Sequence, residues 1–253
     1  MTSTLLSLLG QTSITDHDEL LKAADATLSK NKSDQDAQHV KLVALLKLDR
    51  FEDALKVIES VGEPLKQKAQ LEWAYALYKA GQPARAKEIA QNAAKESDRG
   101  ISHVEAQASY REEDFERAAQ LYAKLSSQRG DAPHEAMDLR INSGAVDAQL
   151  EWSGRGHLVR NKKPGREDLE AFETAYNAAC GSIARNELGQ AEVLLRRSKD
   201  LCNALDDLSE DEKRAEILPI TVQQIYVLVR QGRLSEAHEL ASDISIQEYV
   251  KKT

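Results

Sequence analysis

Five short segments decide the fold: Arg50-Phe51-Glu52-Asp53-Ala54, Gln82-Pro83-Ala84-Arg85-Ala86, Asp114-Phe115-Glu116-Arg117-Ala118, Glu187-Leu188-Gly189-Gln190-Ala191 and Arg233-Leu234-Ser235-Glu236-Ala237. Each segment has an apolar residue three positions before an alanine. The five alanines lie 32, 32, 73 and 46 residues apart. Because self-similarity at periods of roughly 20 to 50 residues is typical of stacked repeats, this spacing predicts a repeated supersecondary unit.

Each segment is predicted to begin the second helix of a helical hairpin. A glycine or a polar residue occupies the preceding turn: Asp49, Gly81, Glu113, Asn186 and Gly232. The alanine is small, so the two helices can approach closely, near the lower end of the ~8–10 Å interaxial range. Four residues further along the same face lie Ile58, Ala90, Tyr122, Leu195 and Ala241. One hairpin cannot bury this face alone, and the hairpins must therefore stack.

The spacing fits the ~34-residue period of tetratricopeptide (TPR) repeats, with a degenerate unit inside the longest interval and an insertion in the last. We therefore predict an all-α fold, a right-handed TPR-type α-solenoid of about six helical hairpins plus an N-terminal helix, as a single domain over residues 1–253. The N-terminal helix covers 16–30, where Asp16 and Glu19 form an Asp version of the capping box. The hairpins lie near 34–61, 66–95, 100–127, 133–162, 167–205 and 213–246.

Two segments interrupt this repeat. The fourth hairpin has a first helix over about 135–152, and the segment 153–166 then reads as an irregular basic loop. The segment 206–214 is an acidic insertion that either lengthens a helix pair or forms a solvated loop. The tail from Ile244 begins another apolar pattern and stops, so we expect the chain to be an N-terminal part of a longer protein.

Composition narrows the class of protein. Ala and Leu contribute 34 and 31 of 253 residues, Gly and Pro only 12 and 5, and aromatic residues 5%, which argues against β-sandwiches, collagen-like chains and disorder. Apolar runs are too short to span a membrane, and no basic flank precedes Leu5 to make a secretory signal. Two cysteines indicate a reduced compartment, so we expect a cytoplasmic protein. The net charge of −8 disfavours general nucleic-acid binding.

No motif of an enzyme, metal site or cofactor site occurs in the sequence. We therefore predict a protein without catalysis, metal, cofactor or small-molecule substrate. Cys180 and Cys202 are interpreted as small apolar residues in a helix interface, with a redox or metal pair as the alternative. Trp73 and Trp152 are interpreted as core between repeats, with ligand-stacking surfaces as the alternative.

The repeat also predicts a partner-binding groove, because the first helices of stacked hairpins line the concave side. Seven residues before four of the alanines stand the basic residues Lys47, Lys79, Arg111 and Arg230. Amides lie one to two turns earlier in the later units, at Asn142, Asn177 and Gln223, and tyrosines lie nearby, at Tyr75, Tyr78, Tyr110, Tyr176 and Tyr226. Amides, cations and phenols can hold an extended or helical peptide with acidic side chains. The alternative for each basic residue is a solvated side chain that complements a helix dipole.

The loop 153–166 is a second candidate site. It carries five basic residues and no acidic one, in an otherwise acidic chain. Such a loop can contact nucleic-acid phosphate, although solvated basic loops are common. The basic residues are Arg155, Arg160, Lys162, Lys163 and Arg166.

Three runs of sequence carry a family resemblance: Ala175-Tyr176-Asn177-Ala178-Ala179-Cys180, then Leu188-Gly189-Gln190-Ala191, then Ser198-Lys199-Asp200-Leu201-Cys202. They resemble the N-terminal TPR domain of the 72-kDa subunit family of the eukaryotic signal recognition particle, in which a Tyr-Asn-x-Ala-Cys helix leads to a helix ending in Asp-Leu-Cys. The stretch from Ala215 through Gly232 to Ala237 is similar to that family's next repeat. The loop 153–166 has no match in the family pattern.

The resemblance implies a scaffold subunit that forms a heterodimer with the C-terminal part of the 68-kDa subunit. It also implies a role in targeting ribosome–nascent-chain complexes to the endoplasmic reticulum, with nucleolar passage during assembly. RNA binding in this family belongs to a basic segment beyond these repeats, so we expect contact with the particle RNA only through the rest of the protein. Tyr176 and Asn177 match the family motif. Two alternatives remain: a chaperone-type clamp for acidic peptides, and direct RNA or ribosome contact through 153–166.

Overall fold

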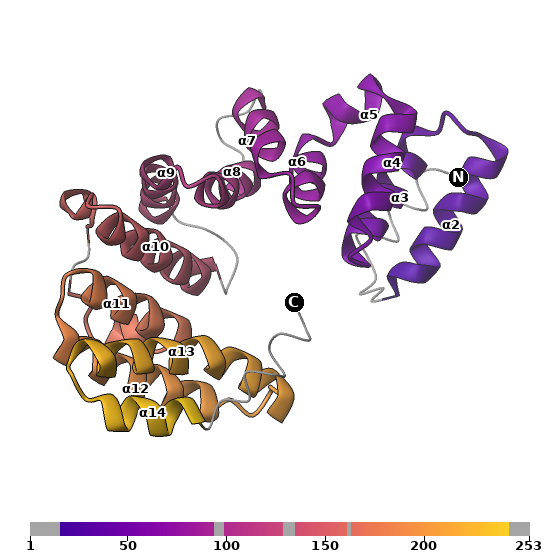
Figure 1. Ribbon diagram of the computed structural model, residues 1–253. Helices are drawn as coiled ribbons and strands as arrows, with labels where there is room; N and C mark the ends of the chain where they lie inside the picture. Colours follow the sequence, from indigo (N-terminus) through magenta and orange to yellow (C-terminus); the bar gives the residue numbers. More distant parts are fainter. Residues whose placement is uncertain (1–15, 94–98, 129–134, 161–162, 243–253) are drawn as a thin grey trace. The chain divides into compact units, whose positions relative to one another are not determined.

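A computed structural model describes residues 16–93, 99–128, 135–160 and 163–242, and in these residues every regular element is helical (Figure 1). The predicted all-α class is confirmed. The chain divides into two compact units, Met1–Leu121 and Tyr122–Thr253. None of the described helices is long and apolar enough to cross a membrane.

The first unit contains an N-terminal helix followed by helical hairpins. The helix α2 (His17–Lys30) matches the predicted range, and the Asp16 side chain accepts a 3.1 Å hydrogen bond from the Glu19 N–H, as predicted for its N-cap. The first helices of the hairpins are α3 (Gln35–Lys47), α6 (Gln70–Lys79) and α8 (Arg99–Arg111). Their second helices are α4 (Phe51–Val61), α7 (Pro83–Asn92) and α9 (Phe115–Ser127), and α9 continues across the division into the second unit. A short helix, α5 (Glu63–Lys68), precedes α6 and was not predicted.

After the end of α9, the second unit contains a long single helix, α10 (Glu135–Trp152), followed by two 3-10 turns, η1 (Gly156–Leu158) and η2 (Glu167–Leu169). Two hairpins follow, α11 (Phe172–Ala184) with α12 (Leu188–Asn203), and α13 (Glu210–Arg230) with α14 (Leu234–Ser242). The fourth hairpin was predicted to have an irregular second half, and among the described residues between α10 and α11 the only regular elements are these two 3-10 turns.

The turn residues are the most regular feature of the chain. Six turns after first helices contain a residue in the left-handed region, with φ between 54° and 77°: Asp49, Gly81, Glu113, Gly154, Asn186 and Gly232. In all six, the next N–H donates to the carbonyl five positions before it, at 2.8–2.9 Å. This is the Schellman motif, which satisfies the last carbonyls of a helix. Five of these residues were predicted, and Gly154 adds the turn of the degenerate unit.

The five repeat alanines are buried, as the prediction of close helix crossings requires. Ala54, Ala86, Ala118, Ala191 and Ala237 are all buried, each five residues after a turn residue. The corresponding position after Gly154 is Val159, which is also buried although no α-helix forms there. In the fourth unit the buried Val159 therefore takes the position that a second-helix alanine has in the other hairpins.

The acidic insertion lengthens a helix. Ser209 caps α13 in a capping box with Glu212, where the Ser209 N–H donates to the Glu212 carboxylate at 2.8 Å and the Glu212 N–H donates to the Ser209 hydroxyl at 3.3 Å. Residues 210–214 therefore form the first turn of α13, and only 206–208 remain a bend. Of the two predicted alternatives, the longer helix is correct for most of the insertion.

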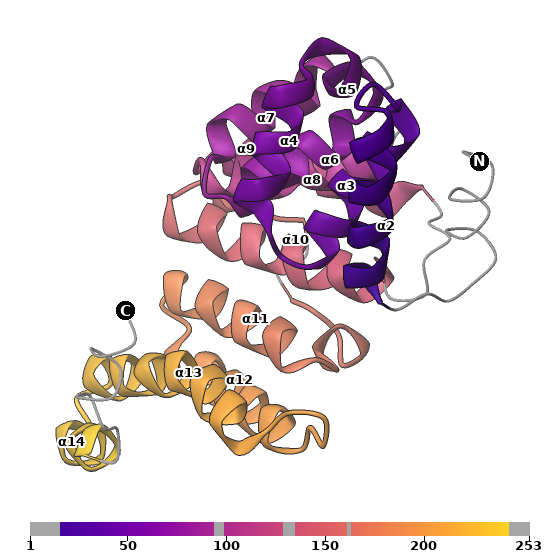
Figure 2. The same ribbon diagram turned by 90° about the vertical axis from the view of Figure 1, so that its right-hand side faces the viewer.

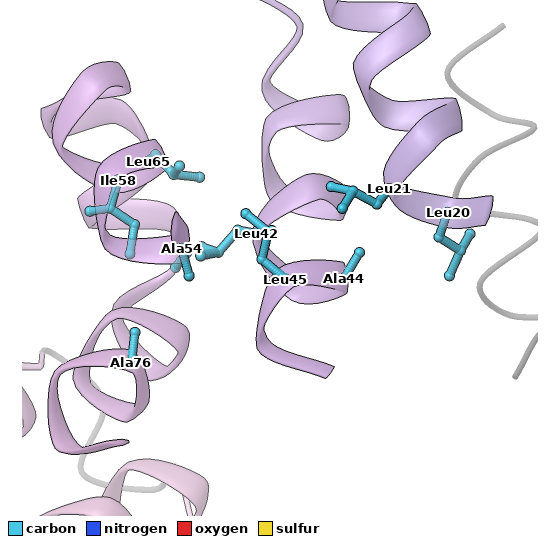
Figure 3. Close-up of a cluster of buried hydrophobic side chains, with 10 residues drawn as sticks. Leu20, Leu21, Leu42, Ala44, Leu45, Ala54, Ile58, Leu65 and Ala76 are labelled. Atoms are coloured by element: carbon cyan, nitrogen blue, oxygen red, sulfur yellow. The ribbon is translucent and has the colours of Figure 1, made fainter. Parts of the chain in front are cut away.

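Each unit has its own apolar core. Figure 3 shows Leu42 and Leu45 of α3 pointing toward Ala54 of α4 in the first unit, with Leu21 of α2 on the other side. In the second unit Cys202 is buried among Leu195 and Ile220, as the helix-interface interpretation predicted. The two tryptophans differ. Trp73 packs partly buried against the core, whereas Trp152 is 49% exposed, so its interpretation as core was wrong.

Candidate partner-binding surface

In the first unit, the predicted basic residues stand at the ends of the first helices. Lys47, Lys79 and Arg111 are the last residues of α3, α6 and α8, and all three side chains are exposed. Each lies two residues before its turn residue, so the Schellman turn places all three at the same point of their hairpins. A cation at a helix C-terminus complements the helix dipole, which supports local stability whether or not a ligand is bound.

Aromatic rings lie beside these cations. The Lys79 Nζ is 5.3 Å from the centroid of the Phe51 ring, and Tyr75 packs edge-on against the same ring at 6.2 Å. Tyr110 packs edge-on against Phe115 at 5.6 Å. A hollow of about 380 Å³ lies where Lys79 and Ala80 meet the first turn of α4. Its remaining lining residues are Asp49, Arg50, Phe51, Glu52 and Asp53. The surface thus offers a cation, an aromatic edge and carboxylates within one small area.

In the second unit the basic series is interrupted. The corresponding last residues of α10 and α11 are Trp152 and Ala184, and only α13 ends in a cation, Arg230. The guanidinium of Arg230 donates to the hydroxyl of Tyr226 at 2.7 Å and to the Oδ1 of Asn186 at 2.9 Å. It also lies 5.6 Å from the Tyr226 ring. Both of these hydrogen-bond partners are neutral.

The predicted amides have different roles. The Nδ2 of Asn177 on α11 donates a 2.9 Å hydrogen bond to the carbonyl of Ile141 on α10. The turn residues also correct the predicted alignment. Asn177 lies nine residues before Asn186, and the positions nine before Gly232 and Gly154 are Gln223 and Ala145. Gln223 is therefore the counterpart of Asn177, whereas Asn142 lies about one helical turn before the matching point.

Tyr176 and the cysteines belong to the packing of the second unit. Tyr176 contacts its apolar core, and Cys180 is half-buried one turn further along α11. Burial raises the pKa of the Cys180 thiol to about 11, against a smaller lowering by a hydrogen bond with Tyr176. Both cysteines are free thiols. The described residues contain no cluster of three or more His, Cys, Asp or Glu placed to hold a metal ion.

The basic loop is anchored by Val159 and exposes most of its charges. Arg160, Lys163 and Arg166 are exposed, while the Nε of Arg155 donates to the Ser153 hydroxyl at 3.1 Å. Lys162 lies outside the described residues.

An ion-pair network next to this loop connects α10 with the turn between α11 and α12. The guanidinium of Arg185 bridges Glu151 of α10 at 3.1 Å and Glu187 at 2.9 Å. The hydrogen bond from Arg185 holds the pKa of Glu187 below its usual value, and the positive charge of Lys163 lowers it further. Glu187 is exposed, so this pair is a modest contribution to stability.

One surface was missed by the sequence analysis. Val222 and Val229 on α13 are 49% and 47% exposed, although both are large apolar residues of a long helix. The signal that could have found them is the spacing of apolar residues along α13, which follows the coiled-coil pattern of four and three rather than the pattern of a buried helix.

Comparison with known proteins agrees with the repeat. The SRP TPR-like repeat family model matches residues 13–149. Signal recognition particle subunit SRP72 of Canis lupus familiaris is 30% identical over 234 residues, which is 90% of this chain and 34% of that protein. The human SRP72 is 29% identical over the same coverage, and the Caenorhabditis elegans SRP72 is 30% identical over 226 residues. The chain spans about a third of the length of these relatives.

Proposed function

The chain belongs to the SRP TPR-like repeat family, and on that premise we propose that it is the protein-binding part of a signal recognition particle subunit of the SRP72 type. In this role it binds the C-terminal part of the 68-kDa subunit as a heterodimer. It thereby supports co-translational targeting of proteins to the endoplasmic reticulum from the cytoplasm. It acts as a scaffold, without catalysis or a cofactor, and residues 1–253 work as one repeat domain.

The observation that carries this proposal is that the first helices of three consecutive hairpins each end in an exposed basic residue. Lys47, Lys79 and Arg111 recur every 32 residues, all exposed, and aromatic rings from neighbouring helices lie beside this row. A regular row of cations beside aromatic edges favours a long peptide with acidic side chains over a small molecule, because each hairpin supplies one similar contact. Tyr75 and Tyr110 supply apolar area next to the row.

A binding assay with the C-terminal half of the 68-kDa subunit tests this proposal. The variant Lys79→Glu plus Arg111→Glu is expected to weaken binding at least ~tenfold, because two cations of the row become repulsive. The matched control is Lys56→Glu plus Arg196→Glu, since both side chains are about three-quarters exposed but lie on second helices. Equal binding by the row variant and the control would refute the assignment to this row.

A second candidate function rests on the loop 153–166. The exposed cations Arg160, Lys163 and Arg166 could contact phosphate of the particle RNA. RNA binding by this chain at ~150 mM salt, abolished when these residues are replaced by Ser, would favour that function. If the chain instead binds acidic C-terminal peptides of chaperones and not the 68-kDa subunit, it is a chaperone-type clamp.

A further inference from the structure

An exposed apolar seam runs along α13. Ala215, Pro219, Val222, Tyr226 and Val229 follow one another at intervals of four, three, four and three residues. All are exposed except Tyr226, which is partly buried. We call these five residues the α13 seam.

Most of the seam lies off the buried face of α13, and the two faces meet at Tyr226. Ile220 and Val227 of α13 are buried in the core of the second unit, and Ile217 and Tyr226 pack partly buried against that core. Figures 1 and 2 show α12 and α14 beside α13, and α13 packs mainly against these two helices and also contacts α11. The helix therefore has two apolar faces, of which one is used inside the chain.

The spacing selects a helix as the occupant. Alternating intervals of four and three average 3.5 residues, the period at which two helices keep their apolar seams in register. An extended peptide presents side chains to one surface at a period of two and would not match this seam. α13 has 21 residues, and the seam from Ala215 to Val229 covers roughly 21 Å of it, which is about two heptads of contact.

The charges along α13 select the direction of that helix. The first turn holds Glu210, Asp211 and Glu212, and the exposed side chains of Glu210 and Asp211 form long ion pairs of 3.8 and 3.6 Å with Lys213 and Arg214. With Glu216, residues 210–216 carry four acidic and two basic side chains, so this end of α13 keeps a net negative charge. The last residue is Arg230, whose hydrogen bonds to Tyr226 and Asn186 leave its positive charge unneutralised. Helices favour acidic residues in the first turn and basic residues in the last turn. An antiparallel helix therefore brings its acidic turn to Arg230 and its basic turn to Glu210 and Asp211, whereas a parallel helix sets like charges together.

The proline of the seam adds a hydrogen-bonding requirement. Pro219 has no N–H, so the carbonyl of Ala215 has no backbone donor one turn later in the helix. Both residues belong to the exposed seam. A lysine, glutamine or asparagine of the occupant can donate to this carbonyl, which would set the register of the two helices.

We propose that the α13 seam binds an antiparallel amphipathic helix of the partner subunit, apolar at heptad spacing, acidic in its first turn and basic in its last. This inference rests on the proposed function, because it assigns one segment of the same partner to a first helix of the second unit. Beyond the proposed function, the inference states that the partner segment is a helix, that it runs antiparallel to α13, and that it binds at the α13 seam.

The first test changes the seam alone. Val222→Asp plus Val229→Asp is expected to weaken binding of the full-length 68-kDa subunit at least ~tenfold, since central apolar contacts dominate interfaces. The control is Val193→Asp, because Val193 on α12 is 62% exposed and lies outside the seam. Circular dichroism and urea midpoints of all variants should match wild type. If wild type binds and the seam variant binds equally well, the seam assignment is wrong while the proposed function stands. If wild type does not bind, the proposed function is wrong.

The second test measures direction with two synthetic probes. Both are helical 21-residue peptides with leucine at the seam spacing, one with Glu in the first turn and Lys in the last, the other with these charges exchanged. Fluorescence anisotropy should show the first peptide binding at least ~fivefold more tightly, and Arg230→Glu plus Asp211→Lys should reverse the preference. Equal binding of the two peptides to wild type would overturn the antiparallel assignment. A concentration-dependent dimer of the chain, lost in the seam variant but not in Val193→Asp, would make the occupant a second copy and overturn the partner assignment.

Discussion

Asn177 on α11 donates a 2.9 Å hydrogen bond from its side-chain amide to the main-chain carbonyl of Ile141 on α10. A Cβ added at Gly144 would lie 3.4 Å from the Cβ of Asn177, so the two helices meet closely at this point. These are consecutive first helices, since the described residues between them form only two 3-10 turns. A polar residue that sequence reasoning assigned to ligand binding thus also joins two repeats where the hairpin pattern is interrupted.

We therefore expect Asn177→Ala to destabilise the chain. The loss of this hydrogen bond should lower the free energy of unfolding by about 1 kcal/mol. Urea unfolding followed by circular dichroism measures it, with Gln223→Ala, at the corresponding position of α13, as the reference expected to stay within ~0.5 kcal/mol. An unchanged urea midpoint for Asn177→Ala would leave ligand binding as its main role.

Close packing at the repeat alanines gives a second prediction. Ala86→Leu should cost about 1–3 kcal/mol, because a larger side chain forces the two helices of the hairpin apart. Ala84 lies two positions before Ala86 in the same helix, and its side chain is exposed. The control variant Ala84→Leu should therefore change the free energy of unfolding by less than ~0.5 kcal/mol. The two thermal midpoints can be compared directly. Similar midpoints would show that the alanine does not determine the helix spacing.

The strained turns give a third prediction. Glu113 adopts φ 59° without being glycine, so Glu113→Gly should stabilise the chain by about 0.5–1 kcal/mol. Asn186→Gly should gain less, because asparagine tolerates this conformation and its Oδ1 accepts a 2.9 Å hydrogen bond from Arg230. Chemical denaturation of both variants measures the difference. A larger gain at Asn186 than at Glu113 would contradict this account of the turns.

The buried thiol gives a prediction with a pH dependence. Burial raises the pKa of Cys180 from 9.0 to about 11, so its thiolate fraction at pH 8 is about 100-fold below that of an unperturbed thiol. Since the thiolate is the reactive form, alkylation by iodoacetamide should be slower by a similar factor than in the urea-unfolded chain. The variant Cys202→Ala leaves a single thiol for mass spectrometry. The rate should rise about tenfold per pH unit up to about pH 11, and a plateau near pH 9 would show that burial does not control it.

The accuracy of sequence reasoning depended on how local each feature is. The turn residues Asp49, Gly81 and Glu113 were predicted correctly because a Schellman turn is made within six consecutive residues. Trp152 was assigned to a core and is exposed, and the described residues that follow it form 3-10 turns in place of the regular second helix of the other hairpins. The counterpart of Asn177 was placed at Asn142, since counting along an irregular repeat cannot reveal where the turn at Gly154 falls.

The sequence by itself determined the helices, the hairpin turns and the alanine crossings, because all of these depend on residues within one or two helical turns of each other. It also determined which residue types stand at the ends of the first helices. Only the tertiary structure decided that Asn177 is used between α10 and α11 and that one apolar face of α13 stays exposed. Both outcomes depend on which helix packs alongside, and no spacing within a single helix specifies its neighbour.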